Sequence, residues 1–413
     1  MSKLEELIEQ YCPDGVEYVP LSSIGTIKRG NGLQKKDFVK AGIGCIHYGQ
    51  IYTKFGLFTN KTLTYVDKEL ADHLLHIEKG DLVIACTSEN VEDVCKAVAW
   101  LGDDSIVTGG HSCVLHHNQN PKYIAYFFQT ESFQRQKRKY AYGTKVIDIK
   151  PDSIGKIEIP LPPLPVQEEI VRVLDTFTEL QAELQAELQK RKQQYNYYLD
   201  NLLNFKNINR GGYQAEVRWM KLKDVCMKTS NIKWKSTTGQ YRYIDLSSVD
   251  IQTHSIISTI EIDKMSAPSR AQQIVQEDDV IFATTRPTQM RACIIPTQYN
   301  GDICSTGYCV LRVDTKILLP RFLFFSLTVS GFKTYLSNNL TLGNYPSISN
   351  NTLLEYEVPV PSLANQQRIV AILDRFDTLT TDLTQGLPAE IEKRRQQYEY
   401  YRDKLLTFKR KGA

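Results

Sequence analysis

The sequence predicts an α+β protein in which two mixed α/β domains are separated by two long antiparallel coiled-coil helices, with a pseudo-twofold internal repeat. Two observations predict this fold. A proline-rich entry followed by a long polar and leucine-rich run occurs twice, from Pro160 to Phe205 and from Pro359 to Phe408. Each run also follows a segment of about 150 residues in which short apolar runs alternate with turns, as in a small sheet-containing domain.

The internal repeat can be read directly in the sequence. The two openings are "PLPPLPVQEEIVRVLDTF" and "PVPSLANQQRIVAILDRF", and the two closings are "KRKQQYNYYLDNLLNF" and "KRRQQYEYYRDKLLTF". Ile170 aligns with Ile369 in the openings, and Lys190 aligns with Lys393 in the closings. The second copy is therefore four residues longer in its middle.

Each copy is predicted to form one helix, the first of about 38 residues and roughly 57 Å. Prolines stop just before each run. Spacings of three and four, which are typical of a helix paired with another helix, connect the apolar residues Ile170, Val173, Phe177, Leu180, Leu184, Leu188, Tyr195, Tyr198 and Leu202. The tetrapeptide "LQAE" occurs twice from Leu180 to Glu187, and Gly386 and Pro388 stand at the corresponding point of the second copy. We therefore expect a kink or bulge there.

Composition indicates an ordinary globular protein. The chain has 413 residues, 42% of them hydrophobic and 23% charged, so two or three domains with their own cores are expected. The net charge of +3 is small, and any nucleic-acid binding has to come from local patches. No signal peptide or membrane-spanning run is evident, and the nine cysteines lack metal-site spacing. We expect reduced core thiols in a cytoplasmic protein.

The two domains share a framework and differ in their loops. We assign residues 1–159 and 207–358 to the domains and 160–206 and 359–413 to the helices. The segment "EKGDLVIA" matches "QEDDVIFA", and "GGHSCVLHH" matches "STGYCVLRV", while the intervening turns differ in their polar residues. Packing fixes the matched strands, and the variable loops are free to recognise different ligands.

This order of domains and helices, with its twice-repeated proline-rich entry and Gln-then-Ile helix start, resembles the specificity subunit of type I restriction-modification systems. The resemblance covers essentially the whole chain. It implies that each domain is a target-recognition domain for one half of a bipartite double-stranded DNA site. It further implies that the helices set the gap between half-sites and dock two methyltransferase subunits, with restriction subunits joining through the complex.

In the first domain, two basic segments are candidates for DNA contact. The run "RQKRKYAYGTK" and the run "IKRGNGLQKKDF" combine positive charge with glycines that allow close backbone approach. The candidate residues are Lys137, Arg138, Lys139, Tyr142 and Lys145 in one run, and Lys28, Arg29, Gln34, Lys35 and Lys36 in the other. For any single lysine, a solvated helix end is an equally good interpretation.

In the second domain, arginine and glutamine after a buried strand are the best candidates for direct base readout, since arginine can bind guanine and glutamine adenine bidentately. These are Arg286, Gln289 and Arg291, and the corresponding residues of the first domain are Ser88, Glu89 and Asn90. A structural arginine paired with a nearby carboxylate such as Asp302 is an equally good interpretation. Further candidates are Lys233, Trp234 and Lys235, and the loop residues Asn344 and Tyr345 beside Gly343.

The tyrosines near the helix ends are candidates for binding partner subunits, although some of them are expected to pack the two helices together. They are Tyr195, Tyr198, Tyr398 and Tyr401, and Tyr197 and Tyr400 belong to the same amphipathic surface at the helix ends. No cofactor loop, Walker motif, methyltransferase signature or nuclease cluster is recognisable, so we expect no catalysis, cofactor or metal in this chain, with His111, His116 and His117 structural or DNA-facing. A coiled-coil scaffold with two protein- or carbohydrate-binding domains is the alternative, and an enzyme with an unrecognised site ranks last.

Overall fold

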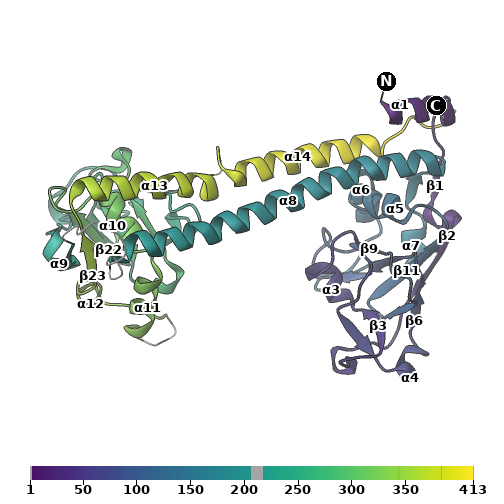
Figure 1. The fold of residues 1–413 in the computed structure, drawn as a ribbon, viewed down its shortest axis with the longest axis horizontal. Coiled ribbons are helices and arrows are strands. Elements are labelled where there is room, and N and C mark those ends of the chain that lie inside the picture. Colours follow the sequence, from purple (N-terminus) through teal and green to yellow (C-terminus); the bar gives the residue numbers. More distant parts are fainter. Residues whose placement is uncertain (1, 206–216, 342, 344, 383, 413) are drawn as a thin grey trace. The chain divides into compact units, whose positions relative to one another are not determined.

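In the computed structural model, contacts group the chain into two units, each containing one domain and helical segments from both repeats. The structure describes residues 2–205, 217–341, 343, 345–382 and 384–412. The first unit comprises Met1–Ala182 and Lys393–Ala413, and the second unit comprises Glu183–Glu392 (Figure 1). Each unit has a main hydrophobic core of its own.

The first repeat forms the predicted uninterrupted helix, α8 (Leu164–Leu203), which has 40 residues. Pro165 lies in its first turn, where the missing N–H costs no helical hydrogen bond. The second repeat is not one helix but two, α13 (Leu363–Thr381) and α14 (Leu387–Leu405), of 19 residues each. The predicted kink is therefore confirmed, and Gly386 is required there because a Cβ atom would collide with the carbonyl oxygen of Thr378.

The first domain is built on two sheets. One has five strands in the order β2 (Gly25–Arg29), β11 (Ser112–His117), β7 (Leu82–Ala85), β9 (Ala97–Trp100) and β4 (Phe58–Thr59). The other has the order β5 (Thr64–Val66), β3 (Ile43–Ile46), β10 (Ile106–Thr108) and β6 (Leu75–Ile77). All four residues of β7 are buried, which explains its unbroken apolar sequence. The helices α5 (Pro121–Phe127) and α6 (Glu131–Arg138) complete its main core.

The second domain repeats this framework. One sheet has the order β15 (Cys226–Met227), β22 (Tyr308–Val313), β19 (Val280–Ala283) and β20 (Ala292–Ile294). The other has the order β17 (Ile260–Ile262), β16 (Tyr241–Ile244), β21 (Ile303–Ser305) and β18 (Ala271–Ile274). The helices α10 (Pro320–Ser326) and α11 (Ser330–Asn338) correspond to α5 and α6. Cys309 pairs with Phe282 as Cys113 pairs with Ile84, so the predicted shared framework extends to the strand register.

Smaller elements connect these parts. Two short antiparallel pairs join β1 (Tyr18–Pro20) to β13 (Glu158–Pro160), and β14 (Arg218–Lys221) to β23 (Glu357–Val360). The remaining α-helices are α1 (Lys3–Tyr11), α2 (Leu21–Ile24), α3 (Tyr48–Thr53), α4 (Lys68–Ala71), α7 (Pro151–Gly155), α9 (Leu222–Val225) and α12 (Asn350–Leu354). Within the described ranges, no helix is both long enough and apolar enough to cross a membrane.

Aromatic stacking joins the helices in the same way in both units. In the first unit, Phe177 of α8 stacks on Tyr401 of α14, with ring centroids 5.5 Å apart. In the second unit, Tyr198 of α8 stacks on Phe376 of α13, with ring centroids 5.3 Å apart. Phe177 is equivalent to Phe376 in the repeat, and Tyr198 is equivalent to Tyr401. In each unit, a residue from the first half of one repeat therefore stacks on a residue from the second half of the other repeat.

The end of the chain is attached to the first domain. Arg410 forms a parallel β-bridge with Val16, and its guanidinium lies 2.6 Å from a carboxylate oxygen of Glu158. The Tyr18 hydroxyl donates to the carbonyl oxygen of Phe408 at 2.9 Å and accepts from the Phe408 amide at 3.1 Å. The yellow end of the chain consequently lies against the purple start in Figure 1. The first domain is thus completed by residues from the opposite end of the sequence.

Candidate nucleic-acid interface

In the first domain, the loop after buried strand β7 lies beside a glycine-containing hairpin. Strand β8 (Thr87–Ser88) pairs with β12 (Ile147–Asp148), and Tyr142 forms a bridge with Asp148. Gly143 has a φ of 114°, and a Cβ atom there would collide with the Val146 carbonyl, so glycine is needed to close the hairpin. The arrangement brings the predicted loop residues Ser88, Glu89 and Asn90 next to the hairpin that carries Tyr142 and Lys145.

The second domain has the same arrangement with different side chains. Thr285 and Thr341 both form bridges with Ser347, as Thr87 and Tyr142 do with Asp148. Arg286 follows directly, with an exposed side chain whose guanidinium carbon lies 4.9 Å from the ring centroid of Tyr345. The Tyr345 side chain is 65% exposed. Asn344, predicted in the same loop, lies outside the described residues.

The two loops therefore occupy equivalent positions on the shared framework in both domains. Arg286 takes the place of Ser88, because each directly follows the threonine that pairs with the hairpin, Thr285 or Thr87. Gln289 is also exposed, at the end of the short 3-10 helix Pro287–Gln289. Residues that are far apart in the sequence thus form one polar surface in each domain, and its chemistry differs between the domains.

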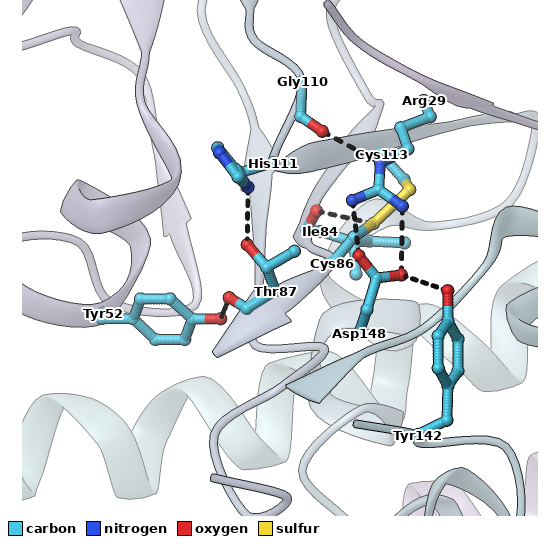
Figure 2. The surroundings of a disulfide bond; sticks show 10 residues. All are labelled: Arg29, Tyr52, Ile84, Cys86, Thr87, Gly110, His111, Cys113, Tyr142 and Asp148. Atoms are coloured by element: carbon cyan, nitrogen blue, oxygen red, sulfur yellow. Dashed lines mark hydrogen bonds and ion pairs between the residues drawn. A yellow bond between two sulfur atoms is a disulfide. The ribbon is translucent and has the colours of Figure 1, made fainter. Parts of the chain in front are cut away.

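A carboxylate holds the first-domain hairpin in place. Both terminal nitrogens of Arg29 donate to Asp148, at 3.0 and 2.7 Å, and its Nε donates to the Gly110 carbonyl at 2.9 Å (Figure 2). The Tyr142 hydroxyl donates to the same carboxylate at 3.2 Å. Hydrogen bonding to Asp148 raises the pKa of Arg29. Arg29 therefore has a structural role that sequence reasoning missed, with its guanidinium fork occupied by the hairpin it supports.

Figure 2 also shows a disulfide behind this network, between Cys86 and Cys113, whose Cα atoms lie 6.2 Å apart. The prediction of reduced thiols is wrong for this pair. The cysteines stand 27 residues apart in sequence, and only the pairing of β7 with β11 brings them together. The other seven cysteines, all within the described ranges, are free. Burial raises the pKa of the Cys95 thiol to about 12, so this thiol stays protonated near neutral pH.

Two of the three histidines predicted to be structural or DNA-facing, His111 and His116, have side-chain partners within the domain. His111 Nδ1 lies 3.0 Å from the Thr87 hydroxyl, and His116 Nδ1 lies 2.7 Å from a carboxylate oxygen of Asp81. Burial lowers the pKa of His117 to about 4, which keeps this imidazole neutral. Among the described residues, no group of three or more His, Cys, Asp or Glu side chains is placed to hold a metal ion.

The first basic run begins in helix α6, which ends at Arg138, and one of its lysines is buried. Arg138 and Lys139 are exposed, but Lys137 is only 1% exposed, and its ammonium donates to the carbonyl oxygens of Glu92 and Val94 at 2.8 and 2.9 Å. The prediction that Lys137 contacts phosphate is therefore wrong, because its charge lies inside the domain. Burial lowers the pKa of Lys137 from its ordinary value near 10.5 to about 8.

This buried ammonium predicts a pH-dependent stability. Between about pH 8 and 10.5 the unfolded chain holds a proton on Lys137 that the folded chain lacks, so the side chain's contribution to the free energy of unfolding rises with pH. The slope is at most about 1.4 kcal/mol per pH unit. We expect the free energy of unfolding of the wild type, minus that of Lys137→Met, to rise across pH 7.5, 8.5 and 9.5 when both are measured by urea denaturation. A constant difference would contradict the buried charge.

The remaining candidates divide into exposed and structural residues. Exposed side chains are those of Lys28, Gln34, Lys35, Lys36, Lys233 and Lys235. Trp234 is half-buried, and its Nε1 donates to the Ala271 carbonyl at 2.7 Å. Arg291 donates to the Val249 carbonyl from a half-buried position, so it supports the loop rather than projecting from it. Asp302 pairs with Arg242 at 2.8 Å, which overturns the alternative that it neutralises Arg286 or Arg291.

The four predicted partner-binding tyrosines are engaged in packing. Tyr195 and Tyr198 stack on Phe376, and Tyr401 stacks on Phe177. Tyr398 is buried, and its hydroxyl donates to Gln129 at 3.3 Å, so the prediction that it offers a docking surface is wrong. The neighbouring residues Tyr197 and Tyr400, which are equivalent in the repeat, are 66% and 61% exposed.

Comparison with known proteins identifies one family. Residues 13–194 and 214–393 each match the type I restriction modification DNA specificity domain. The type I restriction enzyme EcoR124I/EcoR124II specificity subunit of Escherichia coli is 30% identical, over 99% of this chain and 97% of that protein.

Two solved structures have a similar fold. The S subunit of a type I restriction-modification system from M. genitalium matches 95% of this chain and 96% of its own, with a TM-score of 0.52 and 17% identity. A chain from a structure describing complex assembly and conformational transition of the type I R-M system matches 95% of this chain and 97% of its own, with a TM-score of 0.63 and 15% identity.

Proposed function

This chain belongs to the family of type I restriction-modification DNA specificity subunits, and we propose on that basis that each of its two domains reads one half of a bipartite double-stranded DNA site. The first domain would read its half through the loop at Ser88–Asn90 and the hairpin at Tyr142. The second domain would read the other half through Arg286, Gln289 and Tyr345. Arginine and glutamine donors suit base edges in the major groove, and an exposed tyrosine adds stacking or backbone contact.

One observation carries this proposal. Both domains hold the same two loops side by side on the same strand register, but they fill them with different hydrogen-bonding groups. A framework fixed by packing with interchangeable loops is the arrangement expected of two readers for two different sequences. The alternative of a protein- or carbohydrate-binding scaffold does not account for membership of a DNA specificity family.

Mapping of methylated adenines in a host carrying this chain with its neighbouring modification genes tests the proposal. The expected result is one bipartite motif, with two defined half-sites separated by a spacer of fixed length. A host in which the chain produces a single continuous motif, or no motif, would contradict it. Purified chain added to labelled DNA with and without modification subunits is the matching binding assay, and we expect tight binding only in their presence.

We also propose that two modification subunits dock on the helices at two equivalent surfaces marked by Tyr197 and Tyr400. Each of these rings packs edge-on against its neighbour, Tyr197 on Tyr198 at 5.6 Å and Tyr400 on Tyr401 at 5.3 Å between centroids. Exposed aromatic rings held rigid by a second ring are typical anchors in protein interfaces. Since the repeat presents this anchor twice, two copies of the same partner are expected.

Replacing Tyr197 and Tyr400 together with alanine is expected to weaken binding of the modification subunit at least about tenfold, since truncation of an interface aromatic often costs about 2 kcal/mol or more. The unfolding temperature of the isolated chain should stay near the wild-type value. Tyr195→Ala is the matched control, because Tyr195 stacks on Phe376 and its loss should lower that temperature. Undiminished copurification of the double variant would refute the docking surface.

We propose finally that this chain works in the cytoplasm without a cofactor of its own, and that the methyl transfer and DNA cleavage of the complex belong to the modification and restriction subunits. The polar loops support this division, because they offer hydrogen-bonding groups for base edges. A methyltransferase assay on the isolated chain with S-adenosylmethionine and DNA tests it, and measurable transfer would contradict it.

A further inference from the structure

A buried glutamine joins the start of each long helix to its domain. In the first unit, Gln167 lies in the first turns of α8 with its side chain fully buried. Its Oε1 accepts from the Asn120 amide at 3.1 Å, and its Nε2 donates to the Pro162 carbonyl at 2.8 Å and to Gln119 Oε1 at 3.0 Å. Asn120 is itself the N-cap residue of α5. The side-chain amide of Gln167 thus connects the start of α8 to the start of α5.

The second unit repeats two of these three hydrogen bonds and replaces the third, to the Gln119 side chain, with one to a backbone carbonyl. Gln366, also fully buried, accepts from the Leu319 amide at 2.8 Å through Oε1. Its Nε2 donates to the carbonyl oxygens of Ile317 and Pro361, both at 2.9 Å. Leu319 is the N-cap residue of α10, the counterpart of Asn120. The same directional contact therefore occurs in two domains whose loops differ.

Ion pairs further along the helices reinforce the two glutamines. Asp175 of α8 accepts from Lys122 of α5 at 2.6 Å and from the Tyr126 hydroxyl at 2.7 Å. In the second unit, Arg321 of α10 donates to Asp374 and Asp377 of α13, both at 2.6 Å. Each domain is thus held on the long helix of its own repeat by the glutamine and, further along, by the ion pairs. Both contacts involve the same short helix, α5 or α10.

The other repeat's helix supplies a third contact. Asp403 accepts from the Glu131 amide at the N-terminus of α6 at 3.3 Å, and Asp200 accepts from the Ser330 amide at the N-terminus of α11 at 2.8 Å. These aspartates are equivalent in the repeat. Each domain is consequently bound to both helices of its unit by hydrogen bonds whose direction and length are fixed.

Contacts of this kind add a directional restraint to the apolar packing of each domain. A displaced glutamine would leave buried amide and carbonyl groups without partners. The angle and height of each domain along the helix pair then follow from the glutamine. In a protein that reads two half-sites at once, this angle and height decide where each reading surface meets the DNA.

We propose that Gln167 and Gln366 are positioning residues for specificity, which fix the seating of each recognition domain on the helix pair and thereby select one spacer length. The inference rests on the proposed reading of a bipartite site. It assigns the spacer to a second determinant besides helix length. Both glutamines are fully buried, so their replacement should leave both half-site sequences unchanged.

The test uses the complete methyltransferase complex and a plasmid library in which the two half-sites are separated by every spacer from two pairs shorter to two pairs longer than the native one. Wild type, Gln167→Met, Asp175→Asn and Gln185→Met are compared by sequencing of methylated adenines. Gln185→Met is the matched control, because Gln185 is an exposed glutamine on the same helix. Hydrogen exchange of the Asn120 amide reports whether its hydrogen bond to residue 167 has been lost.

We expect Gln167→Met, which removes three hydrogen bonds, to reduce the preference for the native spacer over its neighbours at least about tenfold, while Gln185→Met stays at the wild-type ratio. Asp175→Asn should shift the ratio in the same direction by a smaller factor. A wild-type complex with no bipartite motif would refute the proposed function itself.

Given a bipartite wild-type motif, full spacer preference in Gln167→Met with fast exchange at Asn120 would overturn the inference. If Gln167→Met does not fold, Asp175→Asn decides, and an unchanged ratio in that variant would equally overturn it.

Discussion

A complex built on a chain lacking Leu184–Glu187 is expected to methylate a site with both half-sequences unchanged and a spacer altered by one or two base pairs. These four residues form one of the two "LQAE" units of α8. Their removal shortens the helix by about 6 Å and rotates its C-terminal part by about 40° beyond a full turn. DNA advances about 3.4 Å per base pair, so a rigidly held domain would meet the duplex one or two pairs away from its former position.

Methylome sequencing of the deletion strain measures this result. Insertion of a third "LQAE" unit is the matched control, and it should change the spacer in the opposite direction. The break between α13 and α14 at Gly386 gives the second repeat a place to adjust its own length. A deletion strain with full activity and an unchanged spacer would show that α8 does not act as a ruler. A new half-site sequence would show that the domains are not independent readers.

The second large effect is expected from Arg286→Ala, which should relax the half-site read by the second domain at one base pair. Loss of a bidentate arginine contact costs roughly 1 to 3 kcal/mol, or about 5- to 150-fold in discrimination. Arg286 is exposed at the strand end and lies against the ring of Tyr345, which orients the guanidinium without neutralising it. The half-site of the first domain should be unaffected.

Arg291→Ala provides the contrast, because Arg291 donates to the Val249 carbonyl from a half-buried position. Its loss should lower the unfolding temperature of the chain and leave the sequence preference of the remaining active complex as it was. If the Arg286 variant keeps the original second half-site at full occupancy, the assignment of this side chain to base readout is wrong.

Much of the scaffold could be predicted because its signals are local. Prolines before each helix, the apolar spacing and Gly386 with Pro388 determine where α8 begins and where the second repeat breaks. The same spacing includes Tyr195 and Tyr198 but omits Tyr197. The apolar stripe therefore separates Tyr195 and Tyr198, which pack on Phe376, from the exposed Tyr197.

The site was harder to predict, because it depends on contacts between distant residues. Lys137 follows Phe133 by four residues on the same face of α6, but nothing in the sequence shows that Glu92 and Val94 offer their carbonyls to it. Likewise, nothing in the sequence around Asp148 indicates its partner, and only the strand pairing places its carboxylate against Arg29. Charge identifies candidate residues, whereas the fold decides which of them face solvent.

The attachment of the chain's end to the first domain has a consequence for biosynthesis. Tyr18 and Phe408 are 390 positions apart, so the first domain emerges from the ribosome long before the end of α14 and the bridge at Arg410 that complete it. At about 5 to 20 residues per second, the wait is roughly 20 to 80 s. During this time apolar surface that α14 later covers is open to chaperones, proteases and other nascent chains. A prematurely terminated product would leave that surface exposed.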